Sequence, residues 1–168
     1  MVNLTPVRLA YCAGLIDGEA YVGAIRRMPS AANKLKAPKY TIRVCISMAD
    51  ESPVRYLAET VDATDKVYIR DRRAKAHHSA MYVLDLENNA AERLLRLTLP
   101  YLLCKKRQAE RAIALFEFLA TSKENRNTPN ADRTALQRDR VFLKRCDRFY
   151  LAMKRRVVSN NGVATRPL

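Results

Sequence analysis

The chain has few of the residues that build zinc sites, redox motifs and disulfide-rich domains. It contains no tryptophan, two histidines and four cysteines in 168 residues. Zinc sites and redox motifs need closely spaced pairs such as C-x-x-C, and no two of these cysteines are that close. We therefore expect the cysteines to be small buried side chains in a reducing compartment. They are Cys12, Cys45, Cys104 and Cys146. The histidines, His77 and His78, are expected in a solvated loop or at a phosphate.

Long apolar runs are also missing. No segment approaches the roughly 20 apolar residues that cross a bilayer as a helix. The N-terminal stretch MVNLTPVRLAYCAG lacks the charged start and long apolar core of a secretory signal. These absences argue against a helical membrane protein and a secreted one. We expect an intracellular protein, in the cytoplasm of a prokaryote or an organelle of a eukaryote.

Acidic residues are scarce relative to basic ones. Lys and Arg number 31 against 17 Asp and Glu, which gives a net charge of +14. Such an excess favours a polyanionic partner, with nucleic acid first and an acidic membrane surface second. Basic ribosomal proteins share this charge, so composition alone does not indicate catalysis. The length suits one compact domain, which we place at residues 1–156, followed by a flexible tail at 157–168.

Helix and strand signals alternate along the chain. Thr5 followed by Pro6 is a strong helix start, because a hydroxyl N-cap precedes proline at the first helical position. The periodicity then predicts the following order: a helix over 6–17, strands over 21–28 and 39–48, a short helix from about 52, strands over 66–73 and 80–86, and helices over 89–99, 105–120 and 131–156. This order predicts an α+β domain in which helices pack on one face of an antiparallel sheet.

The strands separate apolar from basic side chains. Tyr40, Ile42 and Val44 point one way, whereas Lys39, Thr41 and Arg43 point the other. An ordinary solvated sheet face would also alternate, but the basic face shows almost no acids. A twisted antiparallel ribbon fits the major groove of DNA. The candidate DNA-binding residues on this face and its hairpins are Arg27, Lys34, Lys36, Lys39, Arg43, Ser47, Lys66, Tyr68, Arg70 and Arg72.

The opening helix carries a stripe of small residues. Ala10, Gly14 and Gly18 recur every four positions, with Ala13 beside them. Small residues at this spacing let another backbone approach closely, and no second helix of this kind occurs in the chain. The stripe predicts a two-fold dimer with an interface at Ala10, Ala13, Gly14 and Asp17, although a close contact with an internal helix remains an alternative.

Two carboxylates, Asp17 and Glu19, lie where this helix should end. A helix C-terminus carries partial negative charge, so acids are disfavoured there. A divalent cation relieves that repulsion, and Mg²⁺ prefers hard oxygen ligands while bridging to phosphates. We therefore expect the Glu19 carboxylate and the Gly18 carbonyl to bind Mg²⁺, or another divalent cation such as Mn²⁺ or Ca²⁺.

The segment AGLIDGE at 13–19 resembles the signature motif of the LAGLIDADG homing endonucleases. Cys12 replaces the first leucine of the motif, Glu19 the second acid and Ala20 the final glycine. The predicted order of elements is similar to the αββαββα core of that family. A single copy of the motif resembles the homodimeric branch, in which each subunit binds half of a near-palindromic site.

The resemblance implies metal-dependent hydrolysis of phosphodiester bonds in a long duplex DNA site, as in intron homing. Glu19 matches the acid of the motif that binds the metal. Asp17 matches an acid of the motif with a structural role. The stretch LPYLLCKKRQAE resembles the family segment that carries an active-site lysine, which matches Lys105, with Lys106 as the second choice. The family often has a polar residue that organises water after the second strand. Asp50 or Glu51 matches it, although Asp50 is also placed to cap the next helix.

Two other functions remain open. A maturase-like RNA-binding protein could keep the fold without cutting DNA, and a DNA-binding regulator could use it without metal chemistry. Both acids and Lys105 favour the endonuclease, because a protein that only binds nucleic acid gains nothing from carboxylates that repel phosphates. We therefore expect duplex DNA and a second copy of the chain as partners, with RNA possible.

Overall fold

The computed structural model describes residues 2–32, 35, 38–70, 80–124 and 140–154. Helices and strands follow the order that the sequence predicts, and most boundaries agree within a few residues. Their bounds are α1 Pro6–Glu19, β1 Tyr21–Arg27, β2 Lys39–Met48, α2 Glu51–Glu59, β3 Val67–Arg70, β4 Met81–Glu87, α3 Asn89–Thr98, α4 Lys106–Glu124 and α6 Arg140–Lys154. Short 3-10 helices at Thr64–Lys66 and Leu99–Tyr101 precede β3 and follow α3.

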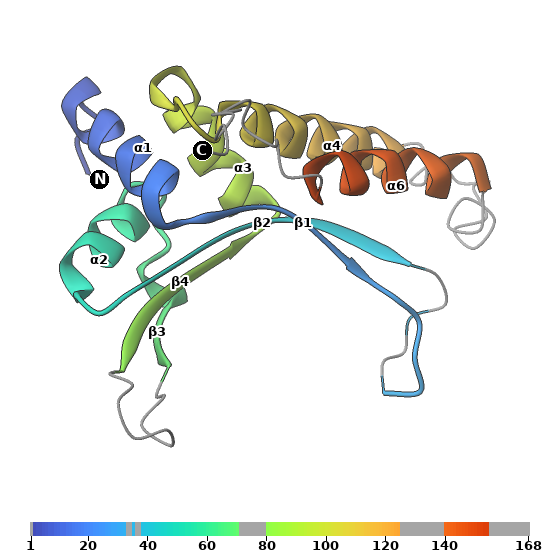
Figure 1. Ribbon diagram of the computed structural model, residues 1–168, viewed down its shortest axis with the longest axis horizontal. Helices are drawn as coiled ribbons and strands as arrows, with labels where there is room; N and C mark the ends of the chain where they lie inside the picture. The colour runs from blue at the N-terminus through green and yellow to red at the C-terminus, as the bar shows by residue number, and fades with distance from the viewer. Residues whose placement is uncertain (1, 33–34, 36–37, 71–79, 125–139, 155–168) are drawn as a thin grey trace, which may run out of the picture.

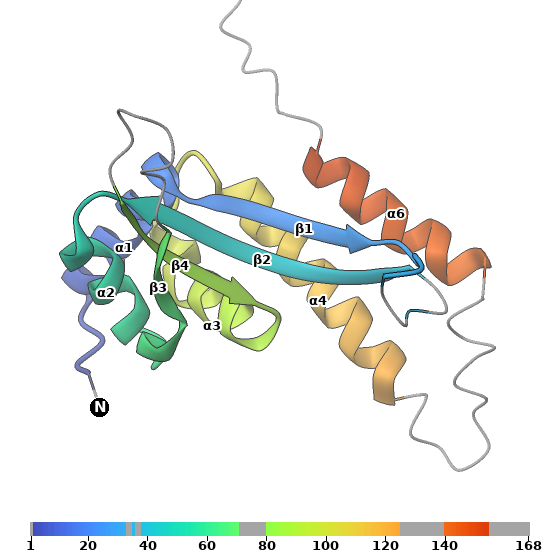
Figure 2. The same cartoon turned by 90° about the horizontal axis from the view of Figure 1, so that it is seen from below.

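The four strands form one antiparallel sheet in the order β1-β2-β4-β3. All the helices lie on the same side of this sheet, and its strands descend on both sides to leave a concave face opposite them (Figure 1). Figure 2 views the molecule from that side, with the strands in front of the helices. The predicted α+β class, an αββαββα core followed by a C-terminal helix, is confirmed.

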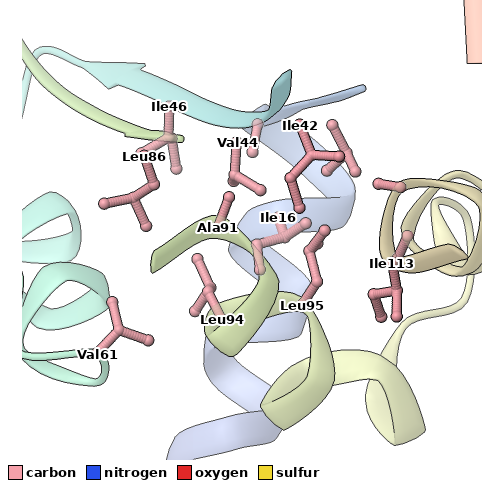
Figure 3. Close-up of a cluster of buried hydrophobic side chains, with 14 of the residues drawn as sticks. Ile16, Ile42, Val44, Ile46, Val61, Leu86, Ala91, Leu94, Leu95 and Ile113 are labelled. Carbon is pink, nitrogen blue, oxygen red and sulfur yellow. The ribbon is translucent and has the colours of Figure 1, made fainter. Parts of the chain in front are cut away.

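The core fills the space between the sheet and the helices. Alternate side chains of β2, such as Ile42, Val44 and Ile46, are at most 1% exposed and point toward Ile16 of α1 and Leu95 of α3 (Figure 3). Burying a side chain of this size stabilises the fold by about 1.5–3 kcal/mol. The alternation of β2 therefore fixes which face meets the helices and which stays free.

The opposite set of side chains faces the concave side and is less uniformly basic than the sequence predicts. Strand β2 places Arg43 and Cys45 there, but β4 pairs with β2 so that Glu87 lies opposite Arg43 and Asp85 opposite Cys45. The expectation of an almost acid-free face is therefore wrong. It came from β2 and β3 alone, and the acids belong to the strand that lies between them.

Helix α6 is hydrogen-bonded to the sheet through the carboxylate of Asp147. The Asp147 carboxylate accepts hydrogen bonds from Arg26 of β1 at 2.7 Å and from the Tyr40 hydroxyl of β2 at 2.8 Å. Burial and the bond to Asp147 raise the pKa of Tyr40 to about 12. The predicted long helix over 131–156 is described only as α6, and the predicted tail at 157–168 lies outside the described residues.

Smaller differences concern a cap and the cysteines. The asparagine at position 89 is predicted from the sequence to cap the helix that follows, but the residue before α3 is Asn88, at φ 52°, and Asn89 is the first helical residue. Cys12 and Cys146 are buried as predicted, but Cys45 is half-buried and Cys104 is exposed, and all four are free. His77 and His78 lie outside the described residues. No helix in the described part of the chain combines the length and the apolar character needed to cross a bilayer.

Candidate active site

The site is built at the C-terminal end of α1. The helix begins as predicted, with the Thr5 hydroxyl accepting a hydrogen bond from the Arg8 N–H at 3.2 Å and Pro6 in the first turn. It ends at Glu19, where the Ala20 N–H donates to the Ile16 carbonyl at 3.2 Å. The last turn therefore carries both acids and leads directly into β1.

Asp17 accepts hydrogen bonds from the backbone at the start of α4. Its carboxylate accepts hydrogen bonds from the backbone N–H groups of Leu103, Cys104 and Lys105 at 2.7, 3.1 and 2.8 Å. These groups lie at a helix N-terminus, where donors lack intrahelical partners and the helix dipole favours negative charge. These are the bonds of a structural acid, which is the role that the resemblance implies for Asp17. A second helix, more than eighty residues away in sequence, compensates its charge.

Lys105 makes the reciprocal contact. Its ammonium donates to the carbonyls of Ile16 at 2.8 Å and Ala20 at 2.6 Å, which lie at the end of α1. A cation here offsets the negative end of the helix dipole. Burial lowers the pKa of Lys105, although the carboxylates of Asp17 and Glu19 act in the opposite direction. A lysine ammonium has three donors, so one remains for a further oxygen.

Glu19 has an exposed side chain. Its charge acts on the Lys105 ammonium, but within the described residues it makes no hydrogen bond or ion pair. Within those residues, no three carboxylate, imidazole or thiol side chains gather into a metal site. Mg²⁺ usually keeps several waters and takes only one or two carboxylates together with substrate phosphates. One exposed glutamate beside the Gly18 carbonyl fits such a site.

The outward side of α1 is open. A Cβ built on Gly14 or Gly18 would meet no atom within 4 Å. Val7 is 79% exposed and Tyr11 49%, and Leu103 beside the end of the helix is 88% exposed. We call these five residues the α1 outer surface. Ala10 is exposed with them.

Two predicted interface residues do not lie on the α1 outer surface. Ala13 is fully buried in the core of its own chain. Asp17 is half-buried and is already bonded to the start of α4. Both therefore support the internal packing of α1, and the outer surface is formed by the remaining small and apolar residues of that helix.

Two arginines of the concave face, Arg27 and Arg43, are held by acids. Arg43 donates two hydrogen bonds to Asp85, one of them at 2.6 Å, and this contact raises the pKa of Arg43. Arg27 donates to Glu87 at 2.6 Å. A bidentate pair fixes the plane of a guanidinium, so the Arg43 side chain is ordered before any ligand binds.

The other predicted DNA-binding residues are placed as follows. Arg70 and Tyr68 are hydrogen-bonded to each other at 2.9 Å on β3, and Lys66 pairs with Asp65 at 2.8 Å in the preceding 3-10 helix. Lys39 begins β2 and Ser47 lies near its end. Lys34, Lys36 and Arg72 lie outside the described residues.

Two further acids predicted near the site stabilise α2. Asp50 accepts a hydrogen bond from the Ser52 N–H at 3.0 Å as the N-cap of that helix. Glu51 pairs with Arg55 one turn further on. The capping role that the sequence left open for Asp50 is thus observed, and its part in catalysis stays a prediction. Lys106, the second choice after Lys105, is the first residue of α4.

Tyr21 lies beside the candidate site and is not among the residues that the sequence predicts there. It is the first residue of β1, two positions after Glu19, and it is 48% exposed. Its hydroxyl donates to the Ala24 carbonyl at 3.2 Å, and the ring lies over Gly23. A Cβ on Gly23 would lie 2.5 Å from that hydroxyl, so a larger residue there would displace the exposed Tyr21 side chain. The available signal was a tyrosine beside the acid with glycine two residues later.

Comparison with known proteins identifies the fold. No family model and no curated protein matches the chain, but solved structures do. The homing endonuclease I-CvuI in complex with DNA aligns with a TM-score of 0.60 and 15% identity over 88% of this chain and 80% of that one. The group I intron-encoded endonuclease I-CeuI, complexed with DNA, gives 0.61 and 16% over 96% and 72%. The archaeal intron-encoded I-Vdi141I, also with DNA, gives 0.60 and 15% over 88% and 82%. The chain therefore has the fold of the LAGLIDADG homing endonucleases, as its motif predicts.

Proposed function

We propose that the protein is a divalent-metal-dependent endonuclease that cleaves duplex DNA as a homodimer. The observation that carries this proposal is Glu19, an exposed carboxylate without a partner in a helix end where the neighbouring acid is fully engaged. Local arrangements that cost stability without an internal partner are typical of functional sites.

The concave face supports duplex DNA as the substrate. It lies opposite the helices (Figure 2), and the strand register places Arg43, Tyr21 and Tyr68 on it. The net charge of +14 favours a polyanion. I-CvuI, I-CeuI and I-Vdi141I, which share the fold, were each solved in complex with DNA.

The metal follows from the chemistry of the site. Glu19 and the Gly18 carbonyl offer the oxygen ligands that Mg²⁺ prefers. A bound Mg²⁺ stabilises charge on the scissile phosphate and makes a water more acidic. Lys105 holds the end of α1 and keeps one donor for a phosphate oxygen or the attacking water. Structures of I-CvuI were determined with Mg or Ca.

The dimer follows from the α1 outer surface. A two-fold contact between two copies of α1 would cover exposed apolar side chains and bring the two Glu19 residues to one place. Each subunit would then cut one strand. A strand rises by about 3.3 Å per residue, so the ten residues of β2 span roughly 33 Å. At about 3.4 Å per base pair this is roughly nine or ten pairs per subunit, and a site near 20 pairs for the dimer.

Selection of cleaved sites from a randomised duplex library in Mg²⁺ tests the proposal. We expect the wild-type chain to enrich one near-palindromic site and Glu19→Gln to lower its cleavage by about 10²-fold or more. Glu19→Gln should still bind the selected site in Ca²⁺. Glu110→Gln, which removes another exposed carboxylate, should cleave as the wild type does.

Two outcomes contradict this proposal. If no duplex is cut while the chain binds structured RNA tightly, the maturase-like function is the better description. If Glu19→Gln and Glu110→Gln cleave equally well, then Glu19 does not hold the metal. Sedimentation of the DNA complex tests the dimer separately, because a single chain per site would remove the role proposed for the α1 outer surface.

A further inference from the structure

Helix α6 carries one acid among several cations. From residue 141 to 154 its single acid is Asp147, and this carboxylate is bonded to the sheet through Arg26 and Tyr40. Residues on a helix are rotated by about 100° from one to the next, so Arg148 and Arg145 are turned away from Asp147 by about 100° and 160°, and Lys144 by about 60°.

These cations line a groove between α4 and α6. The groove encloses about 680 Å³, and its described lining residues are Arg111, Val141, Lys144, Arg145, Arg148, Phe149 and Ala152. Four of them are basic and three are apolar. Within the described residues the lining contains no acid, so the groove combines cations with apolar side chains. We call it the α4–α6 groove.

The cations of the groove are not neutralised by the fold. Lys144 and Arg148 have no hydrogen-bond or ion-pair partner in the described part of the chain. Arg111 donates to the Ala152 carbonyl at 2.7 Å, and Arg145 lies 4.6 Å above the Phe118 ring. By contrast, the arginines at positions 8, 27 and 43 all bind carboxylates. Like charges three or four residues apart on a helix repel each other, and a bound polyanion would relieve that repulsion.

The aromatic ring in the lining of the groove suits nucleobases. Phe149 is half-buried, with its ring 6.0 Å from that of Phe118. Grooves that bind single strands combine backbone-tracking cations with aromatic rings on which bases stack. In a duplex the base faces are stacked on one another and turned inward, so a base can reach Phe149 only from an unpaired strand.

We propose that the α4–α6 groove binds a single strand of nucleic acid. Helices α4 and α6 lie on the other side of the sheet from the concave face (Figure 1), and the residues that line the groove belong to these two helices. A strand in the groove and a duplex on the concave face would therefore not compete. This inference does not rest on DNA cleavage, and either can fail without the other.

Fluorescence anisotropy with labelled twelve-nucleotide oligo(U) and oligo(dT) tests the proposal. We expect Lys144→Gln/Arg148→Gln to weaken binding by about ten-fold and to lower the slope of log K against log salt by about 1.4, because each phosphate contact contributes about 0.7 for single strands. Arg55→Gln/Arg93→Gln is the matched control, since it removes two positive charges from exposed ion pairs on α2 and α3. It should bind within about two-fold of the wild type.

A second readout locates the strand. Photo-crosslinking of the same oligo(U) carrying 4-thiouridine, followed by peptide mass spectrometry, should yield adducts within residues 141–152 or at Arg111. Stronger binding of oligo(U) than oligo(dT) would support a contact to the 2′-hydroxyl, and equal binding would support recognition through backbone and stacking.

Three results would overturn the proposal. One is wild-type affinity in the Lys144→Gln/Arg148→Gln variant, and another is equal loss in the matched control, which would show a general charge effect. The third is crosslinking confined to β1, β2, β3 and β4, which would place the strand on the concave face.

Discussion

The inward and outward sides of the last turn of α1 differ sharply, although only one residue separates their carboxylates. On the inward side Asp17 accepts three backbone hydrogen bonds, and Lys105 caps the helix in return. On the outward side Glu19 has no partner among the described residues, and the glycine positions meet no atom. The difference teaches that one motif can use one acid to hold the fold and leave the next acid exposed.

Removing each acid should give the largest contrast in stability. Asp17→Ala leaves three N–H groups at the start of α4 without their acceptor, and we expect a loss of about 2–4 kcal/mol in the free energy of unfolding. Glu19→Ala should change that free energy by about 0.5 kcal/mol or less, and in the stabilising direction, since it removes an acid from a helix C-terminus. Urea denaturation of the two variants measures both values. Equal losses of unfolding free energy in the two variants would contradict the different roles assigned to Asp17 and Glu19.

A second test concerns Asp147 of α6, which is hydrogen-bonded to the sheet as Asp17 is to the start of α4. The pKa of Tyr40 is raised from 10.0 to about 12, so between these values the folded chain keeps a proton that the unfolded chain has lost. Stability from this group is complete below pH 10 and is lost as the pH rises toward 12.

Tyr40→Phe should therefore remove about 2 kcal/mol of the fall in unfolding free energy between pH 10 and pH 12. The measurement is the difference between wild type and variant at each pH, because lysines elsewhere titrate equally in both. Parallel curves for the two proteins would show that the Tyr40–Asp147 contact does not persist in solution.

The smallest expected effect is that of a substitution on the α1 outer surface. It should stabilise the isolated chain and destabilise the dimer. The methyl group of Gly14→Ala would meet no atom within 4 Å outside its own helix in the described part of the chain, and alanine favours a helix over glycine by about 0.5–1 kcal/mol. The isolated chain should become more stable by this amount, as thermal unfolding at low concentration would show. The dimer should dissociate more readily in sedimentation, because the added methyl separates two closely packed helices. A tighter dimer would contradict the proposed contact.

Much of the fold could be predicted from local patterns. The Thr5–Pro6 start and the alternation of β2 fixed an element and its faces within a few residues. The partners of Asp17 could not be predicted, since they lie 86 to 88 residues away. Asp85 was missed on the concave face because only the strand order β1-β2-β4-β3 places it beside Arg43. Local periodicity gives the face of a strand but not its neighbour.

The reciprocal contact between α1 and α4 has a consequence for protein engineering. The position of Glu19 depends on Lys105 and on the backbone of residues 103–105. Helix α1 therefore cannot be moved to another protein by itself with its geometry preserved. A hybrid protein that receives α1 alone would lack the contacts with residues 103–105 that fix the end of this helix. Transplanting both segments together would carry the geometry intact.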